Sequence, residues 1–125
     1  MNTFNQKKLK KIILNSGSIT KIYSKKTSKY NVREVYIVSI KGKFNKEWRQ
    51  HLNAKKILIC LSGKIIVHIR QKNKILKKLL IESSYIEIPK KKIFRFGGYS
   101  NTENNLLVLS DLENKKLKTN NKFNF

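Results

Sequence analysis

Short segments in which apolar residues recur at every second position constrain the fold of this chain more than any other feature. The clearest is residues 64–70, where Ile65, Val67 and Ile69 fall on one face. This alternation is typical of a strand with one side buried against a core. Past residue 30 the two-residue period dominates, so we expect a fold built from strands.

Further strands are indicated by β-branched and apolar runs between turn-forming residues. They are expected over residues 19–23, 34–40, 55–61, 75–81, 85–88 and 106–109. The Ser62-Gly63 pair separates residues 55–61 from residues 64–70, which predicts a hairpin. Pro89 ends the strand expected over residues 85–88. Short strands at a spacing of roughly 8–12 residues, without a long helical period, predict an all-β sandwich or barrel.

The two ends of the chain differ from this pattern. Residues 5–14 are basic and predict a short helix, and residues 112–125 are polar, rich in Asn and Lys, and expected to be frayed. We therefore divide the chain into an N-terminal extension (residues 1–16), one β domain (residues 17–112) and a polar C-terminal tail (residues 113–125). A length of 125 residues fits a single domain.

The charge of the chain favours anionic partners. Lys and Arg number 29 against 7 Asp and Glu, a formal net charge of +22, which creates a strong positive field. The excess has a second explanation, because Lys, Asn and Ile share A/T-rich codons and all three are abundant here. The basic residues run from Lys7 to Lys122 through every expected element, as a global compositional bias would distribute them.

Cysteine content and the N-terminal residues bear on the compartment. Cys60 is the single cysteine, so an intramolecular disulfide and a zinc site built on several cysteines are excluded. The apolar run at residues 12–14 is too short for the core of a signal peptide, and no stretch is long enough to span a bilayer. We expect a cytoplasmic protein without a membrane span.

Several segments in order resemble one known family. Residues 49–63 resemble the strand-turn-strand centre of the cupin family of nucleotide-sugar 3,4-ketoisomerases, the WxcM-like proteins, in which a His-x-His stretch precedes an apolar strand that ends in Ser-Gly. Four further segments resemble strands of this family. Residues 17–22 resemble its opening strand and residues 33–38 its Val-Tyr strand. Residues 84–89 resemble its Tyr-Ile-Pro strand and residues 105–110 its closing strand. The resemblance implies a cupin-type jelly-roll barrel, the double-stranded β-helix, over about residues 17–112.

The chain also departs from the family pattern. His51 aligns with the second histidine of the pair, while Arg49 stands in place of the first. Glu47-Trp48 replace the glycine that precedes the pair, and residues 90–94 replace a Pro-Gly turn followed by Trp-His. Half of the family's histidine chemistry is therefore missing.

The resemblance implies an isomerase that moves the keto group of a dTDP-linked 4-keto-6-deoxyhexose between C4 and C3, in deoxysugar and polysaccharide biosynthesis. Histidine suits the proton transfers because its ordinary pKa lies near neutral pH. His51 is implied as the acid/base and Tyr36 as a hydrogen-bonding or proton-relay residue. Arg49 and Arg33 are the candidate substrate-binding residues, because Arg binds phosphate oxygens in a bidentate manner.

Other side chains are interpreted structurally. His68 lies opposite the face of Ile65 and Val67, so we expect it on a solvated or subunit-facing surface, and Cys60 is expected in the core. Two histidines outside a His-x-His pair do not make the metal site of many cupins. No cofactor or metal is expected, and the ketoisomerase relatives are understood to work without one.

Two alternatives remain open. The replacement at Arg49 suits a cupin that has lost catalysis and binds a sugar nucleotide or a protein partner. The charge suits a nucleic-acid-binding barrel in which Tyr30, Tyr36, Phe94 and Phe96 stack on bases, although no RNA-recognition signature is present. The resemblance also implies a homodimer with exchanged N-terminal strands, and pairing through a sheet edge would protect that edge.

Overall fold

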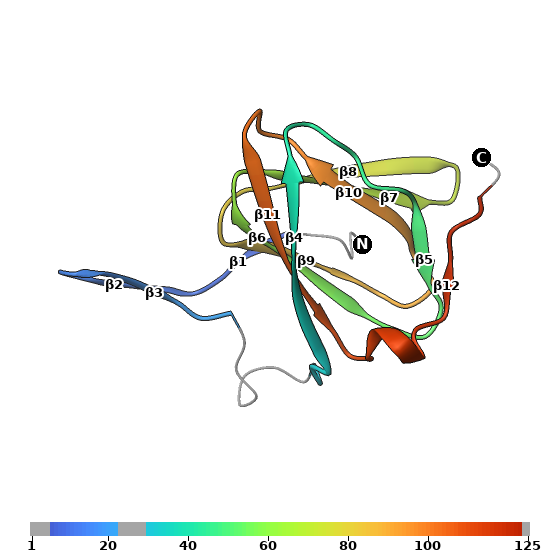
Figure 1. The fold of residues 1–125 in the computed structure, drawn as a ribbon, viewed down its shortest axis with the longest axis horizontal. Coiled ribbons are helices and arrows are strands. Elements are labelled where there is room, and N and C mark those ends of the chain that lie inside the picture. The colour runs from blue at the N-terminus through green and yellow to red at the C-terminus, as the bar shows by residue number, and fades with distance from the viewer. Residues whose placement is uncertain (1–5, 23–29, 124–125) are drawn as a thin grey trace.

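Two antiparallel sheets face each other in the structure (Figure 1), a computed structural model that describes residues 6–22 and 30–123. The first sheet has the order β1 (Lys7–Lys8), β9 (Ser84–Ile88), β6 (Lys56–Ser62), β11 (Glu103–Ser110), β4 (Glu34–Lys41). The second has the order β12 (Thr119–Asn120), β5 (Arg49–His51), β10 (Ile93–Gly98), β7 (Ile65–Gln71), β8 (Lys74–Leu80). A separate hairpin consists of β2 (Lys11–Leu14) and β3 (Gly17–Thr20), and a 3-10 helix, η1, covers Asn114–Lys116. The all-β fold class predicted from the sequence is confirmed.

The main core fills the space between the sheets. It consists of buried apolar residues from both sheets, namely Ile40, Leu58, Cys60, Ile65, Val67, Ile69, Leu80, Ile86, Ile88, Phe94, Leu106 and Val108. The two-residue period explains the selection, because Leu58 and Cys60 face this core while Ile57 and Ile59 belong to a second cluster on the other side of the same strand. Cys60 is fully buried, as expected, and burial raises the pKa of its thiol to about 11.

The hairpin predicted from Ser62-Gly63 is wrong. β6 pairs with β9 and β11 in the first sheet, whereas β7 pairs with β8 and β10 in the second. The chain therefore crosses between sheets at this corner instead of folding back. Gly63 has a φ of +69°, and a Cβ there would lie 2.6 Å from Oδ1 of Asn104, so only glycine fits.

Asn104 fastens the end of the barrel near this corner. It is fully buried at the second position of β11. Its Oδ1 accepts hydrogen bonds from the backbone N–H groups of Lys64 and Ser100 and from the Ser100 hydroxyl. Its Nδ2 lies within 3.0–3.2 Å of the carbonyl oxygens of Ile40, Gly42, Ser100 and Thr102. One side chain thus links both sheets and the two loops beside them.

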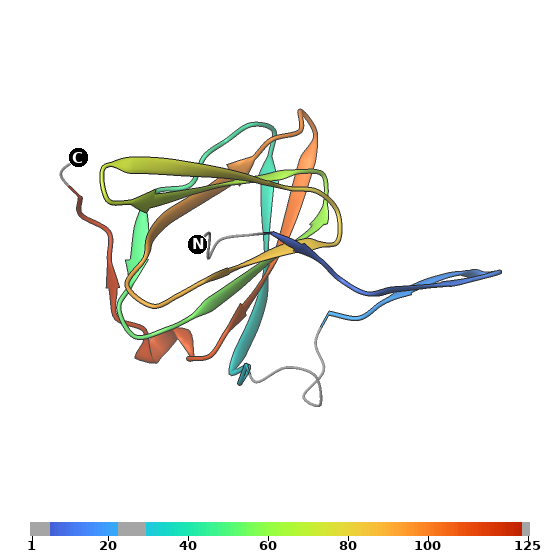
Figure 2. The ribbon, with the colours of Figure 1, turned by 180° about the vertical axis from the view of Figure 1, so that it is seen from behind.

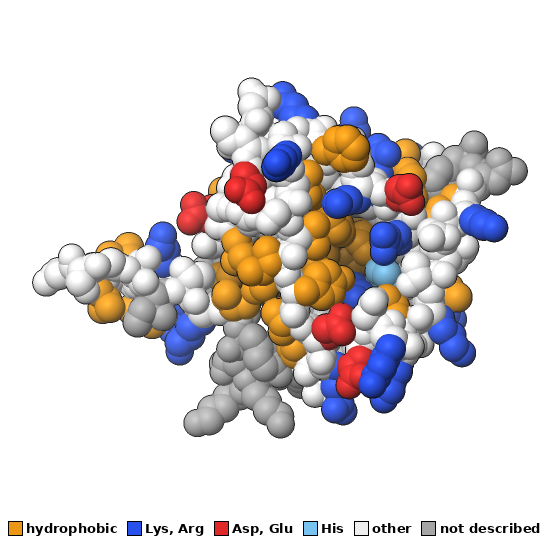
Figure 3. Space-filling model, in the orientation of Figure 1, with side chains coloured by type: hydrophobic (Ala, Val, Ile, Leu, Met, Phe, Trp, Pro, Cys, Tyr) orange, Lys and Arg blue, Asp and Glu red, His pale blue; other side chains and the backbone are white. Residues whose placement is uncertain are grey.

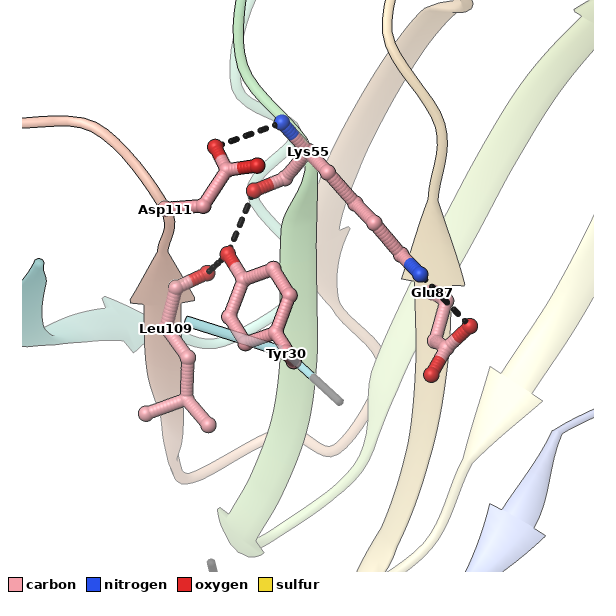
Figure 4. A network of polar contacts seen from close by, with 5 residues as sticks. All are labelled: Tyr30, Lys55, Glu87, Leu109 and Asp111. Atoms are coloured by element: carbon pink, nitrogen blue, oxygen red, sulfur yellow. Dashed lines mark hydrogen bonds and ion pairs between the residues drawn. The ribbon is translucent and has the colours of Figure 1, made fainter. Parts of the chain in front are cut away.

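A second polar network holds the chain ahead of β4 against the outer side of the first sheet (Figure 4). The Tyr30 hydroxyl donates to the carbonyl oxygens of Lys55 and Leu109, so it bridges β11 and the residue before β6. The Lys55 backbone N–H donates to Asp111, and its ammonium lies 3.2 Å from the Glu87 carboxylate. Burial, with the nearby Asp111 charge, raises the pKa of Tyr30, which keeps the donating hydroxyl protonated.

The helix predicted over residues 5–14 is wrong in the described part. β1 pairs with β9, and β2 pairs with β3, so hydrogen bonding to other strands decides the conformation here. The β2–β3 hairpin projects away from the two sheets in both views (Figures 1 and 2). The strand expected over residues 19–23 is part of this hairpin and begins at Gly17, while Tyr23 lies outside the described residues.

The C-terminal segment is more ordered than its polar composition suggests. Thr119 and Asn120 form β12, which pairs with His51 and Gln50 of β5 at the edge of the second sheet. Asn53 adds to this attachment, because its side chain donates to the Lys116 carbonyl and accepts from the Lys118 N–H. Pairing to an exposed sheet edge outweighs the low apolar content that predicted fraying.

Candidate active site

A cavity of about 190 Å³ opens between the two sheets at the side where β4 faces β5. Figure 3 shows this face as a hollow with apolar side chains in its depth and Lys and Arg side chains around it. Its lining residues are Tyr36, Val38, Lys46, Glu47, Arg49, His51, Lys56, Leu58, Phe94, Arg95, Phe96, Val108, Asn114 and Leu117. Of the sequence-predicted site residues, the cavity brings together His51, Tyr36 and Arg49.

His51 ends β5 and is held on two sides. It is only 7% exposed, its Nδ1 lies 2.9 Å from the Thr119 hydroxyl of β12, and its ring meets Phe94 edge-on with centroids 5.5 Å apart. In the tautomer in which Nδ1–H donates to the Thr119 oxygen, Nε2 retains its lone pair. This fixed orientation is what a proton-transferring histidine requires.

The surroundings of His51 favour its neutral form. Burial, together with the positive charges of Lys56 and Arg49, lowers the pKa of His51 to about 4. The imidazole is therefore unprotonated at neutral pH and able to accept a proton. A cation formed on it would be disfavoured until a negative charge developed close by.

Tyr36 and Arg49 line the cavity from facing strands. Tyr36 on β4 is 38% exposed, and burial raises the pKa of its hydroxyl, with the Glu34 charge adding to the effect. Its hydroxyl thus remains a hydrogen-bond donor at neutral pH. Arg49 is two residues before His51 in β5, so both side chains point to the same side of the second sheet.

Arg33 lies away from these residues. It is exposed, precedes β4, and its backbone N–H donates to the Ser110 carbonyl. It is not among the residues that line the cavity. Its predicted contact with substrate stays a prediction.

Lys56 is a cavity residue that the sequence analysis did not single out. It opens β6, is 1% exposed, and its ammonium has no hydrogen-bond partner among the described residues. The nitrogen lies 5.4 Å from the centre of the Tyr36 ring. The signal was present in the sequence, because Lys56 alternates with Leu58 and Cys60, both of which face the core.

His68 sits on the opposite side of the second sheet from the main core, as expected. It is nevertheless only 8% exposed, since Trp48 lies beside it at a centroid distance of 6.3 Å and Arg95 Nε donates to its Nδ1 at 3.3 Å. The Arg95 guanidinium also stacks on Trp48, 4.8 Å from the ring centre. Burial, with the charges of Arg95 and Lys77, lowers the pKa of His68.

Two kinds of feature are absent from residues 6–22 and 30–123. Within these ranges no three side chains of His, Cys, Asp or Glu come together in a group that could hold a metal ion. The same ranges contain no helix with the length and apolar content to cross a bilayer.

Comparison with protein families gives one match that spans almost the whole chain. Residues 2–118 match the family described as FdtA: WxcM-like, C-terminal. The chain belongs to this family. This WxcM-like protein was matched by no sequence among curated proteins.

Solved structures similar to this WxcM-like protein include sugar isomerases. QdtA, a sugar 3,4-ketoisomerase from Thermoanaerobacterium thermosaccharolyticum solved with TDP, aligns with a TM-score of 0.83 and 18% identity over 97% of this chain and 89% of its own. The WlaRB TDP-quinovose 3,4-ketoisomerase of Campylobacter jejuni aligns with a TM-score of 0.78 and 21% identity over 90% and 88% of the two chains.

A third structure with this fold has a different activity. The RmlC epimerase of Mycobacterium tuberculosis aligns with a TM-score of 0.77 and 11% identity over 93% of this chain and 66% of its own. Together the alignments confirm the RmlC-like jelly roll, the cupin fold predicted from the sequence. The activity has to be argued from the site, because one fold supports different reactions.

Proposed function

We propose that the protein is a sugar 3,4-ketoisomerase that acts on a dTDP-linked 4-keto-6-deoxyhexose. The observation that carries this proposal is a buried, neutral and oriented histidine, His51, in the cavity of a WxcM-like jelly roll. QdtA, which has this fold, was solved with TDP and, as a variant, with TDP-4-keto-6-deoxyglucose. A cytoplasmic location and a role in polysaccharide biosynthesis belong to the same proposal.

His51 acts as the base in this mechanism. It takes the proton from C3, the electron pair forms a C3–C4 double bond, and the C4 keto oxygen becomes negatively charged. The proton then returns at C4 while the C3 hydroxyl gives up its proton and becomes the new ketone, so no oxidant or reductant is needed. The Tyr36 hydroxyl lines the same cavity and suits the transfer of the hydroxyl proton between O3 and O4.

The diphosphate is assigned to the exposed part of the cavity. Arg49 and Lys46 are exposed residues of the cavity lining. Positive side chains at an opening attract a dianionic group without a large loss of solvation. The long-range field of the +22 chain would increase the rate at which such a substrate arrives.

Turnover of dTDP-4-keto-6-deoxyglucose followed by NMR tests the activity. We expect a product with the ketone at C3, and a loss of at least about a hundredfold in kcat for His51→Asn, which is the usual contribution of an acid/base group. His68→Asn is the matched control, because His68 lies on the outer side of the sheet, and it should keep full activity. An active wild type whose rate survives His51→Asn would contradict the role of His51.

A catalytically lapsed binding protein is the second candidate. The observation in its favour is that His51 is the single histidine of the cavity, with Arg49 where the family has another. This candidate predicts binding of the sugar nucleotide without turnover. Recovery of turnover in Arg49→His would show that the pocket is intact and that only the proton transfer is lost.

A nucleic-acid partner is less well supported by the aromatic residues named for it. Tyr30 is 8% exposed and Phe94 is 2% exposed, so neither presents a ring face to a base. Phe96 is half-buried in the cavity lining. What remains for this candidate is Tyr36, which is 38% exposed, and the net charge.

We also propose a homodimer formed through the N-terminal hairpin. Ile13 of β2 is 80% exposed on a hairpin that projects from the barrel, and Val35 and Ile37 of the edge strand β4 are 53% and 61% exposed. Exchange of the hairpin between two copies would bury such surfaces. Sedimentation equilibrium of the wild type and of Ile13→Lys tests this, and a monomeric wild type would contradict it.

A further inference from the structure

The ammonium group of Lys56 is buried without an acceptor. Its Nζ is sealed from solvent and has no hydrogen-bond partner in the described parts of the chain. The face of Tyr36 at 5.4 Å offers it a cation–π contact. Glu34 and Asp111 attract it from a longer range, but neither forms an ion pair with it. Three strong N–H donors therefore lack an oxygen partner.

The fold itself does not require a charge at this position. Lys56 alternates with Leu58 and Cys60 on the inner side of β6, where an apolar residue would pack without cost. Its neighbour Lys55 points the other way and pairs with Glu87 at 3.2 Å (Figure 4). Because leaving a buried donor unsatisfied is expensive, the missing acceptor is expected to come from a ligand.

The depth of Lys56 identifies the kind of oxygen it would receive. Arg49 is exposed and suits a phosphate at the opening, whereas Lys56 is 1% exposed beside Leu58 and Val108. A diphosphate is too strongly hydrated to be placed in such apolar surroundings. A sugar that enters the cavity between Tyr36 and His51 would bring its oxygens to this depth.

We propose that Lys56 is a catalytic residue that donates a hydrogen bond from its ammonium to the keto oxygen of the substrate and stabilises the negative charge that develops there. The proposal rests on the proposed ketoisomerase function. As His51 takes the C3 proton, the electron pair of the C3–H bond forms the double bond and the carbonyl pair moves onto O4. Lys56 keeps its proton throughout, and when C4 is protonated O4 gains the proton that O3 gives up through Tyr36. Such a preorganised charge in a water-poor site is an effective catalyst.

The charge of Lys56 also affects the protonation of His51. Lys56 helps to keep His51 neutral before the reaction, because its charge lowers the pKa of the imidazole. Once the proton has moved, the negative charge at O4 lies near both cations and offsets their repulsion. Lys56 and His51 therefore stabilise the negatively charged intermediate more than they stabilise the empty site.

Variants of two adjacent lysines test the proposal. Lys56→Met removes the charge and keeps the length of the side chain, Lys56→Gln retains a neutral N–H donor, and Lys55→Met is the matched control on the other side of β6. We expect Lys56→Met to lower kcat by at least about a hundredfold, as the loss of an oxyanion donor does. Lys56→Gln should recover part of this loss, and Lys55→Met should turn over as the wild type does.

Binding measurements separate this proposal from the proposed function. Calorimetry with dTDP alone should give similar affinities for the wild type and Lys56→Met, and the keto-sugar nucleotide should bind the variant more weakly. Equal loss of dTDP affinity would place Lys56 on the phosphates and overturn the proposal, as would a kcat for folded Lys56→Met within threefold of the wild type. A wild type without turnover would end the ketoisomerase function, while the sugar-dependent affinity would still decide the role of Lys56.

Trapping with borohydride distinguishes a hydrogen bond from a covalent bond. A neutral Lys56 amine that attacked the ketone would form an imine with release of water, and reduction would fix the sugar to the protein. We expect no increase in protein mass when the wild type is treated with the keto-sugar nucleotide and borohydride. A mass increase that Lys56→Met abolishes would overturn the proposed role.

Discussion

Asn104 and Lys56 are buried polar side chains at opposite ends of the same strand pair, and their surroundings differ completely. Asn104, next to the end of β6, has protein partners for both its oxygen and its nitrogen. Lys56, which pairs with Ser110 at the other end of β11, has none for its ammonium among the residues that the structure describes. Because an unsatisfied buried donor lowers stability, the contrast between Asn104 and Lys56 calls for a functional explanation. The first group holds the barrel together, and the second is open to a ligand.

The largest expected effect is that of Asn104→Ala. The variant leaves the N–H groups of Lys64 and Ser100 and several carbonyl groups without partners in a closed site. We expect a loss of about 3 to 5 kcal/mol in the free energy of unfolding, measured by urea denaturation. Asn101→Ala, in the exposed part of the same loop, is the control and should be nearly neutral. Equal effects of the two substitutions would remove the contrast between the ends of the strand.

The next effect depends on pH and arises from His51. Its pKa is about 4 in the folded protein and near 6.5 when unfolded, so the unfolded state binds more protons between these values. The stability that neutral His51 contributes to the folded state is fully present above about pH 6.5. It is lost as the pH falls toward 4, by an amount on the order of 3 kcal/mol. We expect His51→Asn to gain this much relative to the wild type between pH 7 and pH 4. A constant difference across that range would contradict the depressed pKa.

Lys56→Met should stabilise the protein, although the same change is expected to lower kcat by at least about a hundredfold. Burial lowers the pKa of Lys56, so the charged form destabilises the folded state at neutral pH. Replacement by an apolar side chain of similar length should add about 1 to 3 kcal/mol to the free energy of unfolding. The gain should shrink as the pH rises through the lowered pKa toward the ordinary value near 10.5, because the lysine then loses its charge. A lower melting temperature for the variant at pH 7 would show that the ammonium is satisfied after all.

The smallest effect belongs to Lys55→Met. The ion pair of Lys55 with Glu87 is formed by side chains that are 36% and 48% exposed. Such exposed pairs contribute about 0.5 kcal/mol or less, and added salt weakens them further. We therefore expect thermal melting of Lys55→Met and Glu87→Gln to be close to that of the wild type. A large loss of stability in Lys55→Met would mean that the exposed ion pair does not explain the small effect expected for Lys55.

Sequence patterns located most strands because one side of each strand had to be apolar. The period of residues 64–70 placed Ile65, Val67 and Ile69 in the core correctly. The same rule would have placed Lys56 inside the barrel, but a second lysine beside it and the high overall content of lysine made it look like surface. Which strands pair could not be predicted in the same way. Ser62-Gly63 suits a hairpin and a crossing between sheets equally well, and β6 and β7 each pair with strands that follow later in the chain.

The site was predicted in part. The family resemblance singled out His51, and its place in the cavity depends on pairing of β5 with β10 and β12, for which residues 49–51 give no local signal. Thr119 was missed because its segment looked like a polar tail, and the two-residue edge strand β12 carries no apolar period. Arg33 was chosen because it flanks the proposed site in the sequence, and a position in the sequence does not show whether a side chain reaches a cavity.

The crossing of the chain at Gly63 and the pairing of β4 with β11 also bear on the rate of folding. Glu34 of β4 is paired with Ser110 of β11, so β4 cannot form its pairing until the distant strand β11 is available. Topologies with such distant pairings usually fold in about milliseconds to seconds. At about 5–20 residues per second, ribosomal synthesis takes several seconds to bring β11 out after β4. During that interval an apolar edge lacks its neighbour, and the repulsion of a +22 chain for other copies of itself would then keep nascent molecules apart.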